Sequence, residues 1–253
     1  MEFARSVRAK GDKLIVFAVQ DMASPEIAKE AERAYWMKVT QYKKFVFLLL
    51  ANRIKKIALI GKIDKSVIYD ENTPRDREYV KAMNGLGDKK DYSILEEFTR
   101  RLARIGVEVI DGREYLSHLA PPRGILSKAE PDERVLGDMD FGFKAARDLA
   151  GLDIGQTVIV KDRNIVAVEA IEGTDAAIER AGRLAGPGCV MAKASRPDQD
   201  LRWDVPTVGP ETMENLARNR FSGIAIESGK MYLVEKERFV SLADASGIVI
   251  KVF

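Results

Sequence analysis

The sequence is poor in the two side chains that most often build metal and catalytic centres, because it contains one cysteine, Cys189, and one histidine, His118. A single cysteine cannot form a disulfide within the chain, so the sequence predicts a reducing, cytosolic environment. A structural zinc site needs several cysteine or histidine ligands and is excluded within one chain. Any metal must therefore be a hard ion held by oxygen atoms, such as Mg²⁺ or Mn²⁺.

The sequence also lacks a long hydrophobic run and an excess of charge of one sign. Its most apolar segment, Phe45 to Ala51, is far shorter than the roughly 20 residues that a membrane-spanning helix needs. The first five residues contain no apolar signal region, so we expect a soluble protein that stays in the cytoplasm. The chain has 41 Lys and Arg against 39 Asp and Glu. This balance excludes an acidic tail and gives no broad electrostatic case for nucleic acid.

Hydrophobic residues make up 46% of the 253 residues, which is enough to bury a full core. At roughly 100–150 residues per domain, this length predicts one large or two small domains. In the first half, apolar runs typical of buried parallel strands alternate with segments of helical periodicity. This alternation predicts an open, Rossmann-like α/β sheet. We expect helices at 3–9, 41–53 and 93–105, a polar helix opened by Thr73 and Pro74, and strands at 13–19, 34–39, 56–60 and 107–110.

A polar stretch after Pro121 and Pro122 marks a domain boundary near residue 130, which divides the chain into 1–130 and 131–253. The second half reads as a compact α/β domain with a mixed sheet and helices. Its first two strands, at 156–161 and 165–169, are joined by three residues that are typical of a hairpin. The other expected elements are helices at 138–149, 174–184, 210–218 and 237–245, and strands at 189–192, 223–226, 231–234 and 248–252.

A first polar segment, Glu169 to Asp175, lies between a strand and a helix of the second half. Thr174 is a favourable N-cap residue and Asp175 suits the positive helix terminus, so helix capping alone explains the segment. In the alternative interpretation, Gly173 lets a phosphate approach the helix N-terminal amides, and Glu172 holds a divalent metal. Both interpretations stay open at this point.

A second polar segment, Lys193 to Pro210, is long for a connection inside a compact domain, and such connections are commonly functional or disordered. Disorder would leave Trp203 exposed, which favours function. Its cations suit phosphate oxygens and its carboxylates suit a metal ion. An exposed loop of ion pairs is the alternative. The polar side chains of the segment include Lys193, Arg196, Asp198, Gln199, Asp200, Arg202, Asp204 and Thr207.

The first half offers weaker candidates for a ligand site. Lys62 follows a strand that ends at Ile60, and ligands of open α/β sheets bind beyond the carboxyl ends of strands. Asp88 and Asp91 lie in the next loop. A lone lysine or aspartate in a loop is more often simply solvated, so these positions gain weight only if other site residues join them.

Two lysines, Lys43 and Lys44, stand beside Phe45 and Phe47. Cations next to aromatic side chains on one helix fit contact with a membrane surface. A helix that turns its aromatic face to the protein core explains the same pattern. The core-facing interpretation is the favoured one.

Three segments of the second half resemble the signature of the LpxI-type UDP-2,3-diacylglucosamine pyrophosphatases: Gly151 to Asp162, Val168 to Asp175 and Asp200 to Pro210. The first half resembles this family more loosely, through Ala58 to Ile63 and the helix after Asp91. The resemblance implies hydrolysis of the pyrophosphate of UDP-2,3-diacylglucosamine to UMP and 2,3-diacylglucosamine 1-phosphate (lipid X). In the family this reaction is a cytoplasmic step of lipid A synthesis in Gram-negative bacteria.

The resemblance also implies a divalent metal, Mg²⁺ or Mn²⁺, and a substrate held between two α/β domains. Asp204 matches the carboxylate that we carry over as essential, where it would position the metal or the attacking water. Glu172 and Asp175 would complete the set of metal ligands. The residues expected to bind substrate are Lys62, Asp91, Gly173, Thr174, Lys193, Gln199, Arg202 and Thr207. Attack at the sugar-side phosphorus is a further implication of the resemblance.

The sequence departs from the family at its start. Family members begin with a strand and a glycine-rich turn before the helix matched by Glu2 to Ala9, so the first domain is expected to lack its first strand. The expected partners are the lipid substrate and, transiently, the inner-membrane surface, with no nucleic acid; a homodimer is compatible with the sequence. Two other functions stay open. They are a non-catalytic protein that binds a nucleotide-lipid and a lipid-phosphate cytidylyltransferase.

Overall fold

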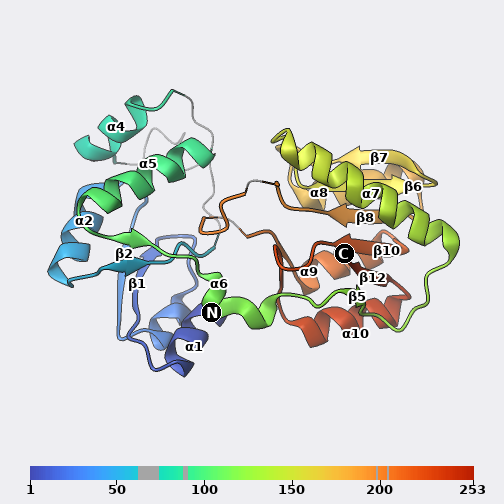
Figure 1. Cartoon of the computed structure of the whole chain (residues 1–253), viewed down its shortest axis with the longest axis horizontal. Coiled ribbons are helices and arrows are strands. Elements are labelled where there is room, and N and C mark those ends of the chain that lie inside the picture. Colours follow the sequence, from blue (N-terminus) through green and yellow to red (C-terminus); the bar gives the residue numbers. More distant parts are fainter. Residues whose placement is uncertain (62–73, 88–90, 198, 204) are drawn as a thin grey trace. The chain divides into compact units, whose positions relative to one another are not determined.

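The computed structural model describes residues 1–61, 74–87, 91–197, 199–203 and 205–253, without the side chain of Asp91. The chain divides into two compact units (Figure 1). Unit 1 contains residues 1–116 and 202–204, and unit 2 contains residues 117–201 and 205–253. The boundary was expected near residue 130. Residues 117–130 lie in unit 2 because strand β5 (Gly124–Ile125) pairs with the last strand of the chain, β12 (Val249–Val252).

Unit 2 is built on a six-stranded mixed sheet with the order β5-β12-β10-β8-β6-β7. Strands β8, β10 and β12 run parallel to one another, whereas β5, β6 and β7 each run antiparallel to a neighbour. The inner strands are β12, β10 (Gly223–Ile226), β8 (Val190–Lys193) and β6 (Thr157–Lys161), and β5 and β7 (Asn164–Val168) form the two edges. The mixed sheet predicted for the second half is therefore confirmed.

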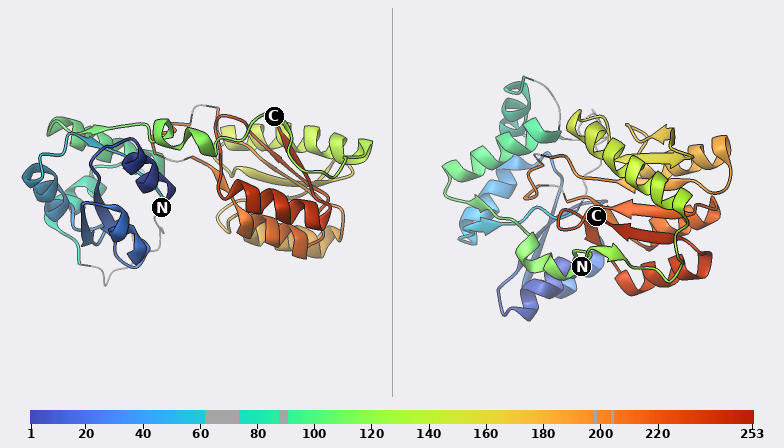
Figure 2. Two further views of the ribbon diagram at one scale, coloured as in Figure 1. Left: turned by 90° about the horizontal axis from the view of Figure 1, so that it is seen from below. Right: turned by 45° about the vertical axis from the view of Figure 1, so that its right-hand side comes forward.

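Helices cover both faces of this sheet (Figure 2). Side chains alternate along each strand, so that Val158 and Val160 contact one helical layer and Ile159 contacts the other. Helix α7 (Glu133–Gly151) packs on the first face. Helices α8 (Thr174–Ala185), α9 (Pro210–Arg218) and α10 (Lys236–Ser246) pack on the second. At about 25 cal/mol per Å² of buried apolar surface, these two layers are the main source of unit 2's stability.

The described residues of unit 1 form two separate pairs of parallel strands with helices around them. Strand β1 (Ile15–Val19) pairs with β2 (Arg33–Met37), and β3 (Lys56–Ile57) pairs with β4 (Glu108–Val109). Its core joins Leu49, Leu102 and Val109 with the side chain of Trp203. The helical segments are α1 (Glu2–Ala9), η1 (Pro25–Glu30), α2 (Tyr42–Ala51), α4 (Arg77–Asn84), α5 (Asp91–Arg104) and α6 (Arg113–Leu116).

Several expected boundaries were wrong. The polar helix begins at Arg77 and not at Pro74, because the Asp76 side chain accepts the Tyr79 N–H and caps it. The strand expected at 56–60 pairs only over Lys56 and Ile57. The strand expected at 231–234 is β11 (Tyr232–Leu233), which pairs outside the main sheet with β9 (Thr207–Val208). The short helix η2 (Ser117–Leu119) and strands β5 and β9 had no sequence signal.

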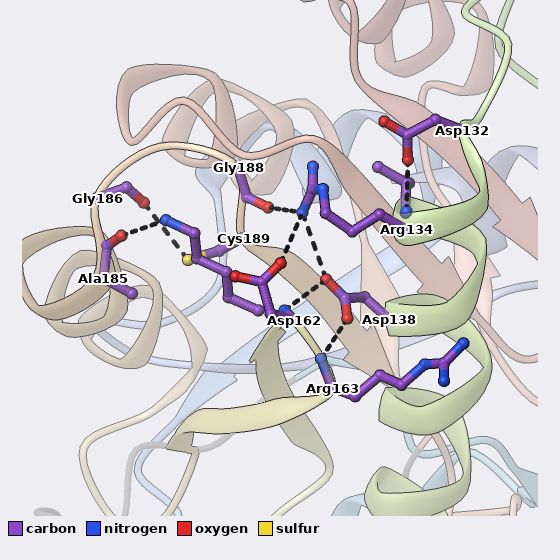
Figure 3. A network of polar contacts seen from close by, with 11 residues as sticks. Asp132, Arg134, Asp138, Asp162, Arg163, Ala185, Gly186, Gly188 and Cys189 are labelled. Carbon is purple, nitrogen blue, oxygen red and sulfur yellow. Dashed lines mark hydrogen bonds and ion pairs between the residues drawn. The ribbon is translucent and has the colours of Figure 1, made fainter.

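The β6–β7 hairpin depends on one buried carboxylate, Asp138 of α7 (Figure 3). Asp162 and Arg163 in the turn have φ angles of 53° and 56°, which cost energy in residues other than glycine. The two carboxylate oxygens of Asp138 accept the Asp162 and Arg163 N–H groups at 3.0 and 2.6 Å, and Arg134 lies 3.5 Å away. The buried carboxylate thereby holds the turn in its left-handed conformation.

In the part of the chain that the structure describes, no helix combines the length and the apolar character that a membrane-spanning segment requires.

Candidate functional site

Polar side chains gather at one edge of the unit 2 sheet. Strands β7, β8 and β10 point the same way, so their carboxyl ends meet at this edge, where β6 begins. Glu169 follows β7, Lys193 ends β8, Glu227 follows β10 and Thr157 starts β6. Ligands of open α/β sheets bind beyond the carboxyl ends of strands. We call this group of residues the carboxyl-edge cluster.

Lys193 is the centre of the cluster and is 7% exposed. Its Nζ donates to the Oγ1 atoms of Thr157 and Thr174, both at 3.0 Å, and lies 3.5 Å from Glu169 Oε2. The Thr174 hydroxyl in turn donates to Glu169 Oε1 at 2.8 Å. A buried ammonium needs such partners, because removing an unpaired charge from water costs several kcal/mol.

Only one of the two carboxylate oxygens of Glu169 accepts a hydrogen bond from the described residues. Oε2 is buried and accepts no hydrogen bond from the described residues, although Lys193 compensates its charge. The chain approaches closely here: a Cβ atom at Gly155 would lie 1.9 Å from the Glu169 carbonyl oxygen. Because Gly155 has no side chain, Glu169 can lie at this end of the sheet. Its Oε2 atom can accept a hydrogen bond from a water molecule or from a ligand.

A second buried carboxylate, Glu227, ties the adjacent loop to the same edge. Its Oε2 accepts the Ser195 N–H at 2.9 Å, and its Oε1 lies 3.6 Å from Lys230 Nζ. The Ser195 hydroxyl donates to the Lys230 carbonyl at 3.0 Å. These contacts fix the start of the long polar segment directly after Lys193.

The N-terminus of α8 opens onto the cluster without a side-chain cap. Gly173 is the N-cap residue with φ 85°, and Thr174 is the first helical residue. Of the two interpretations left open for this segment, the one with Thr174 as the N-cap was wrong, because its hydroxyl binds Lys193 and Glu169 instead. Uncapped amides at a helix N-terminus favour an anion, and the neighbouring Lys193 adds a positive charge.

Glu172 and Asp175, the two acids expected to hold a metal, are engaged with other side chains. Glu172 Oε1 pairs with Arg180 at 2.5 Å, and its Oε2 accepts the Ala170 N–H. Bonding to its own backbone N–H, and then to Arg180, lowers the pKa of Glu172. Asp175 Oδ1 accepts from Asn215 Nδ2 at 3.0 Å. Among the described residues, no three acids, histidines or cysteines group as metal ligands.

The long polar segment belongs partly to each unit. Gln199 Oε1 accepts from the Arg196 N–H and from Gln156 Nε2, within unit 2. Arg202 and Trp203 then join unit 1, where the Arg202 guanidinium lies 5.5 Å from the Trp203 ring centre. Thr207 returns to unit 2 at the start of β9, and its hydroxyl donates to the Val205 carbonyl.

Trp203 is anchored in the unit 1 core. Its Nε1 donates to Thr99 Oγ1 at 3.0 Å, and its ring meets Tyr92 edge-on at 4.9 Å. The prediction that Trp203 is not left exposed is confirmed, since it is 9% exposed.

Of the expected substrate residues, the structure brings Lys193 and Thr174 together, with Gly173 beside them. Gln199 accepts from Gln156, the residue before Thr157, whereas the Thr207 hydroxyl bonds within its own loop. Arg202 belongs to unit 1. Lys62 and Asp204 lie outside the described residues, as does the side chain of Asp91.

Residue reasoning gave no site role to three members of the cluster: Thr157 and Glu169, which stood in segments that it singled out, and Glu227. Glu169 and Glu227 each follow an apolar strand directly, which was the available signal. Thr157 begins a strand, and only its antiparallel pairing with β8 brings it opposite Lys193. The surface depression lined by Arg134, Asp138 and Arg163 is a poorer candidate, because Asp138 is already used by the hairpin.

Fold and site together define a protein of two α/β units with a buried cation at the carboxyl edge of the second sheet. The family model described as the LpxI C-terminal domain matches residues 122–251, and that of the LpxI N-terminal domain matches residues 1–119. The chain belongs to the LpxI family.

A relative from Caulobacter vibrioides, named UDP-2,3-diacylglucosamine pyrophosphatase LpxI, is 34% identical over 170 residues. The aligned part covers 64% of this chain and 61% of the relative, so the chain matches less than two thirds of that protein's length. Among solved structures, RibD of Acinetobacter baumannii shares 17% identity over 46% of this chain and 35% of its own, with a TM-score of 0.29. A likeness that low carries no argument about the fold.

Proposed function

We propose that the protein hydrolyses the pyrophosphate bond of UDP-2,3-diacylglucosamine and releases UMP and 2,3-diacylglucosamine 1-phosphate for lipid A synthesis. The observation that carries this proposal is the match of the family models to both halves of the chain, with Lys193 buried at the matched sheet edge. The name of the Caulobacter relative supports the same substrate.

The carboxyl-edge cluster suits phosphoryl transfer by its charge and its donors. In the proposed reaction, the oxygen of water bonds to the sugar-side phosphorus, and the bond to the bridging oxygen breaks. The bridging oxygen leaves with UMP, and the water gives up its proton to solvent. Negative charge grows on the phosphoryl oxygens, and Lys193 with the α8 amides would stabilise it. Glu169 is a positioning residue that holds Lys193 and Thr174.

Asp204 is the residue that we propose to position the attacking water, as its place in the family motif indicates. We also propose a requirement for Mg²⁺ or Mn²⁺, ions that suit carboxylate ligands. Glu172 and Asp175 would have to exchange partners to hold such an ion, because Arg180 pairs with Glu172 and Asn215 donates to Asp175. When bound, such an ion would supply charge stabilisation at the phosphoryl oxygens.

The direct test is release of UMP from UDP-2,3-diacylglucosamine by the purified full chain. We expect turnover with Mg²⁺, loss after EDTA and recovery after Mg²⁺ is added back. Asp204→Ala should lower kcat by roughly 10²–10³, whereas Asp200→Ala, in the same segment, should retain activity. In ¹⁸O-labelled water, the label should enter the sugar 1-phosphate and not UMP.

The same assay contains the results that would contradict the proposal. Binding of the substrate without turnover would identify a nucleotide-lipid binding protein. Consumption of CTP with phosphatidate would identify a cytidylyltransferase. Full activity in EDTA would remove the metal requirement, and full activity of the Asp204→Ala variant would remove the role of that carboxylate.

The lipid nature of this substrate leads to one more part of the proposal, a transient association with the cytoplasmic face of the inner membrane. A diacylated sugar is held in the bilayer by its acyl chains, since each buried CH₂ group contributes about 0.8 kcal/mol. The enzyme would then meet its substrate at the membrane surface.

A further inference from the structure

Helix α2 exposes apolar side chains on a surface that carries positive charge. Phe47 is 69% exposed and Leu50 is 56% exposed, although both are large hydrophobic residues. They are three residues apart, so they lie on one face of the helix, about one turn from each other. Single exposed hydrophobic residues are common, but an adjacent pair on one helix is a candidate contact surface.

The protein core does not account for this pair, because α2 uses a different face for packing. Phe45 contacts Phe17 edge-on at 5.3 Å and stacks with Phe98 at 5.7 Å, and Leu49 is fully buried. The core-facing interpretation of the sequence pattern is thus confirmed for Phe45 and is wrong for Phe47. Figure 1 shows α2 at the margin of unit 1, beside α5.

Two cations precede the exposed pair on the same helix. Lys43 and Lys44 are exposed and stand one turn before Phe47, at positions four and three residues earlier. No aspartate or glutamate occurs between Glu32 and Asp64, so this part of the chain is purely basic in a protein whose net charge is +2. Its cations are Arg33, Lys38, Lys43, Lys44, Arg53, Lys55, Lys56 and Lys62.

Nearby contacts leave this charge in place on the helix. Asp76 approaches α2, but its Oδ2 accepts the backbone N–H of Lys43 at 2.6 Å, and its Oδ1 caps α4. Lys44 Nζ donates to the Trp36 carbonyl, a neutral group, at 3.2 Å. Lys56 lies opposite Glu108 in the β3–β4 pair, so we place the charge of the surface on Lys43 and Lys44.

We propose that Lys43, Lys44, Phe47 and Leu50 form a lipid-docking surface for an anionic bilayer. Exposed Phe and Leu side chains enter the boundary of head groups and acyl chains, while flanking lysines bind anionic head groups. Two side chains are too small a surface for a stable protein interface, which buries roughly 1,200–2,000 Å² in total. A phosphate backbone would attract the lysines but would give Phe47 and Leu50 no contact.

This inference rests on the proposed function for its biological sense, because a lipid substrate requires the enzyme to reach a membrane. It is tested separately from catalysis, by sedimentation of the full chain with vesicles. We expect the protein to bind vesicles of phosphatidylglycerol and phosphatidylethanolamine, to bind phosphatidylcholine vesicles several-fold less, and to be released by high salt. An excess of a DNA oligonucleotide should not displace it.

Matched variants locate the surface. Phe47→Ser with Leu50→Ser should lower vesicle binding by about tenfold or more, and Lys43→Gln with Lys44→Gln by roughly fivefold per lysine. Leu184→Ser in α8, where the side chain is also 69% exposed, and Lys29→Gln with Lys81→Gln are the controls and should bind as the unaltered chain does. Equal thermal midpoints would show that all variants are folded.

Three results would overturn the inference: no binding of the unaltered chain to anionic vesicles, full binding by the Phe47 and Leu50 variant, or equal loss in the controls. An assay on substrate dispersed in detergent measures hydrolysis without membrane binding, so it distinguishes failure of this inference from failure of the proposed function. We expect the Phe47 and Leu50 variant to hydrolyse dispersed substrate within about twofold of the unaltered chain, and to be slower only on substrate held in anionic vesicles.

Discussion

At the scale of single residues, the carboxyl-edge cluster shows how a buried charge is made tolerable. Lys193 is compensated by one carboxylate and two hydroxyl groups that come from two segments of unit 2, the start of β6 and residues 169–174. The sequence singled out Lys193 as a candidate phosphate ligand. It gave its partner Glu169 no role, because a glutamate after a strand is usually solvated.

The change Lys193→Met tests this residue as a positioned cation. It removes the charge that would stabilise the phosphoryl oxygens, so kcat should fall by roughly 10²–10³. It also leaves Glu169 without its partner, which should cost about 3 kcal/mol of unfolding free energy in urea. Adding Glu169→Gln should restore most of the stability and none of the activity.

The control for this prediction is Lys161→Met. Lys161 ends β6 at the other edge of the sheet, where its Nζ donates to the Ala185 carbonyl at 2.6 Å. We expect this variant to keep its kcat. A Lys193→Met chain that remains fully active would show that the buried lysine has a structural role only.

Asp138 is a second residue whose replacement separates stability from catalysis. An asparagine there can accept only one of the two turn N–H groups and sets its own NH₂ group against the other. Asp138→Asn should therefore lower the free energy of unfolding by about 2–3 kcal/mol and leave kcat unchanged. Asp140→Asn, at an exposed position of the same helix, should change neither the free energy of unfolding nor kcat. A stable Asp138→Asn chain would mean that the turn holds its conformation without the carboxylate.

At the scale of elements, two glycines flank the carboxyl-edge cluster for different physical reasons. Gly155 has no space for a Cβ atom, whereas Gly173 has open space but a φ of 85°. Gly155→Ala should displace Glu169 and lower both stability and kcat. Gly173→Ala should cost only about 1 kcal/mol, through backbone strain. Urea unfolding and the UMP assay on both variants measure the difference, and equal effects would contradict it.

The two glycines also differ in how far the sequence explained them. Gly173 was noticed because it precedes a helix, where glycine has a known use. Gly155 was part of a motif but had no assigned reason, since its need for glycine comes from Glu169, fourteen positions away in the chain and adjacent in space.

At the scale of the whole molecule, each unit carries its own spectroscopic or chemical reporter. Both tryptophans, Trp36 and Trp203, lie in unit 1, and Cys189 is fully buried in unit 2. Burial raises the pKa of the Cys189 thiol above its ordinary value, so the folded unit should react slowly with thiol reagents. Fluorescence and thiol reactivity therefore follow the two units separately.

Trp203→Ala uses these reporters. Loss of a buried tryptophan from the core should destabilise unit 1 by about 3–5 kcal/mol, while Thr99→Val, which removes its hydrogen bond, should cost about 1 kcal/mol. We expect the Trp36 fluorescence transition to move to lower urea and the onset of Cys189 reactivity to stay in place. Movement of both by the same amount would show that the units unfold as one.

Local patterns were sufficient for most of unit 2, because its strands are short apolar runs and its helices have clear periodicity. They predicted the hairpin at Asp162 and Arg163 and the helix that begins at Thr174. They failed for β5 and β9, each two residues long, because such strands exist only through their partners. The place of Arg202 and Trp203 in unit 1 likewise depends on contacts distant in sequence.

The sequence by itself determined the family, the α/β class and the polar segments around Lys193, since these follow from composition and from contiguous motifs. Only the tertiary structure decided that Lys193 is buried with Glu169, Thr157 and Thr174. It also decided that Trp203 belongs to unit 1 and that Phe47 faces solvent. These features depend on strand pairing and on the choice of the helix face that packs. Neighbouring residues alone do not determine either of these two properties.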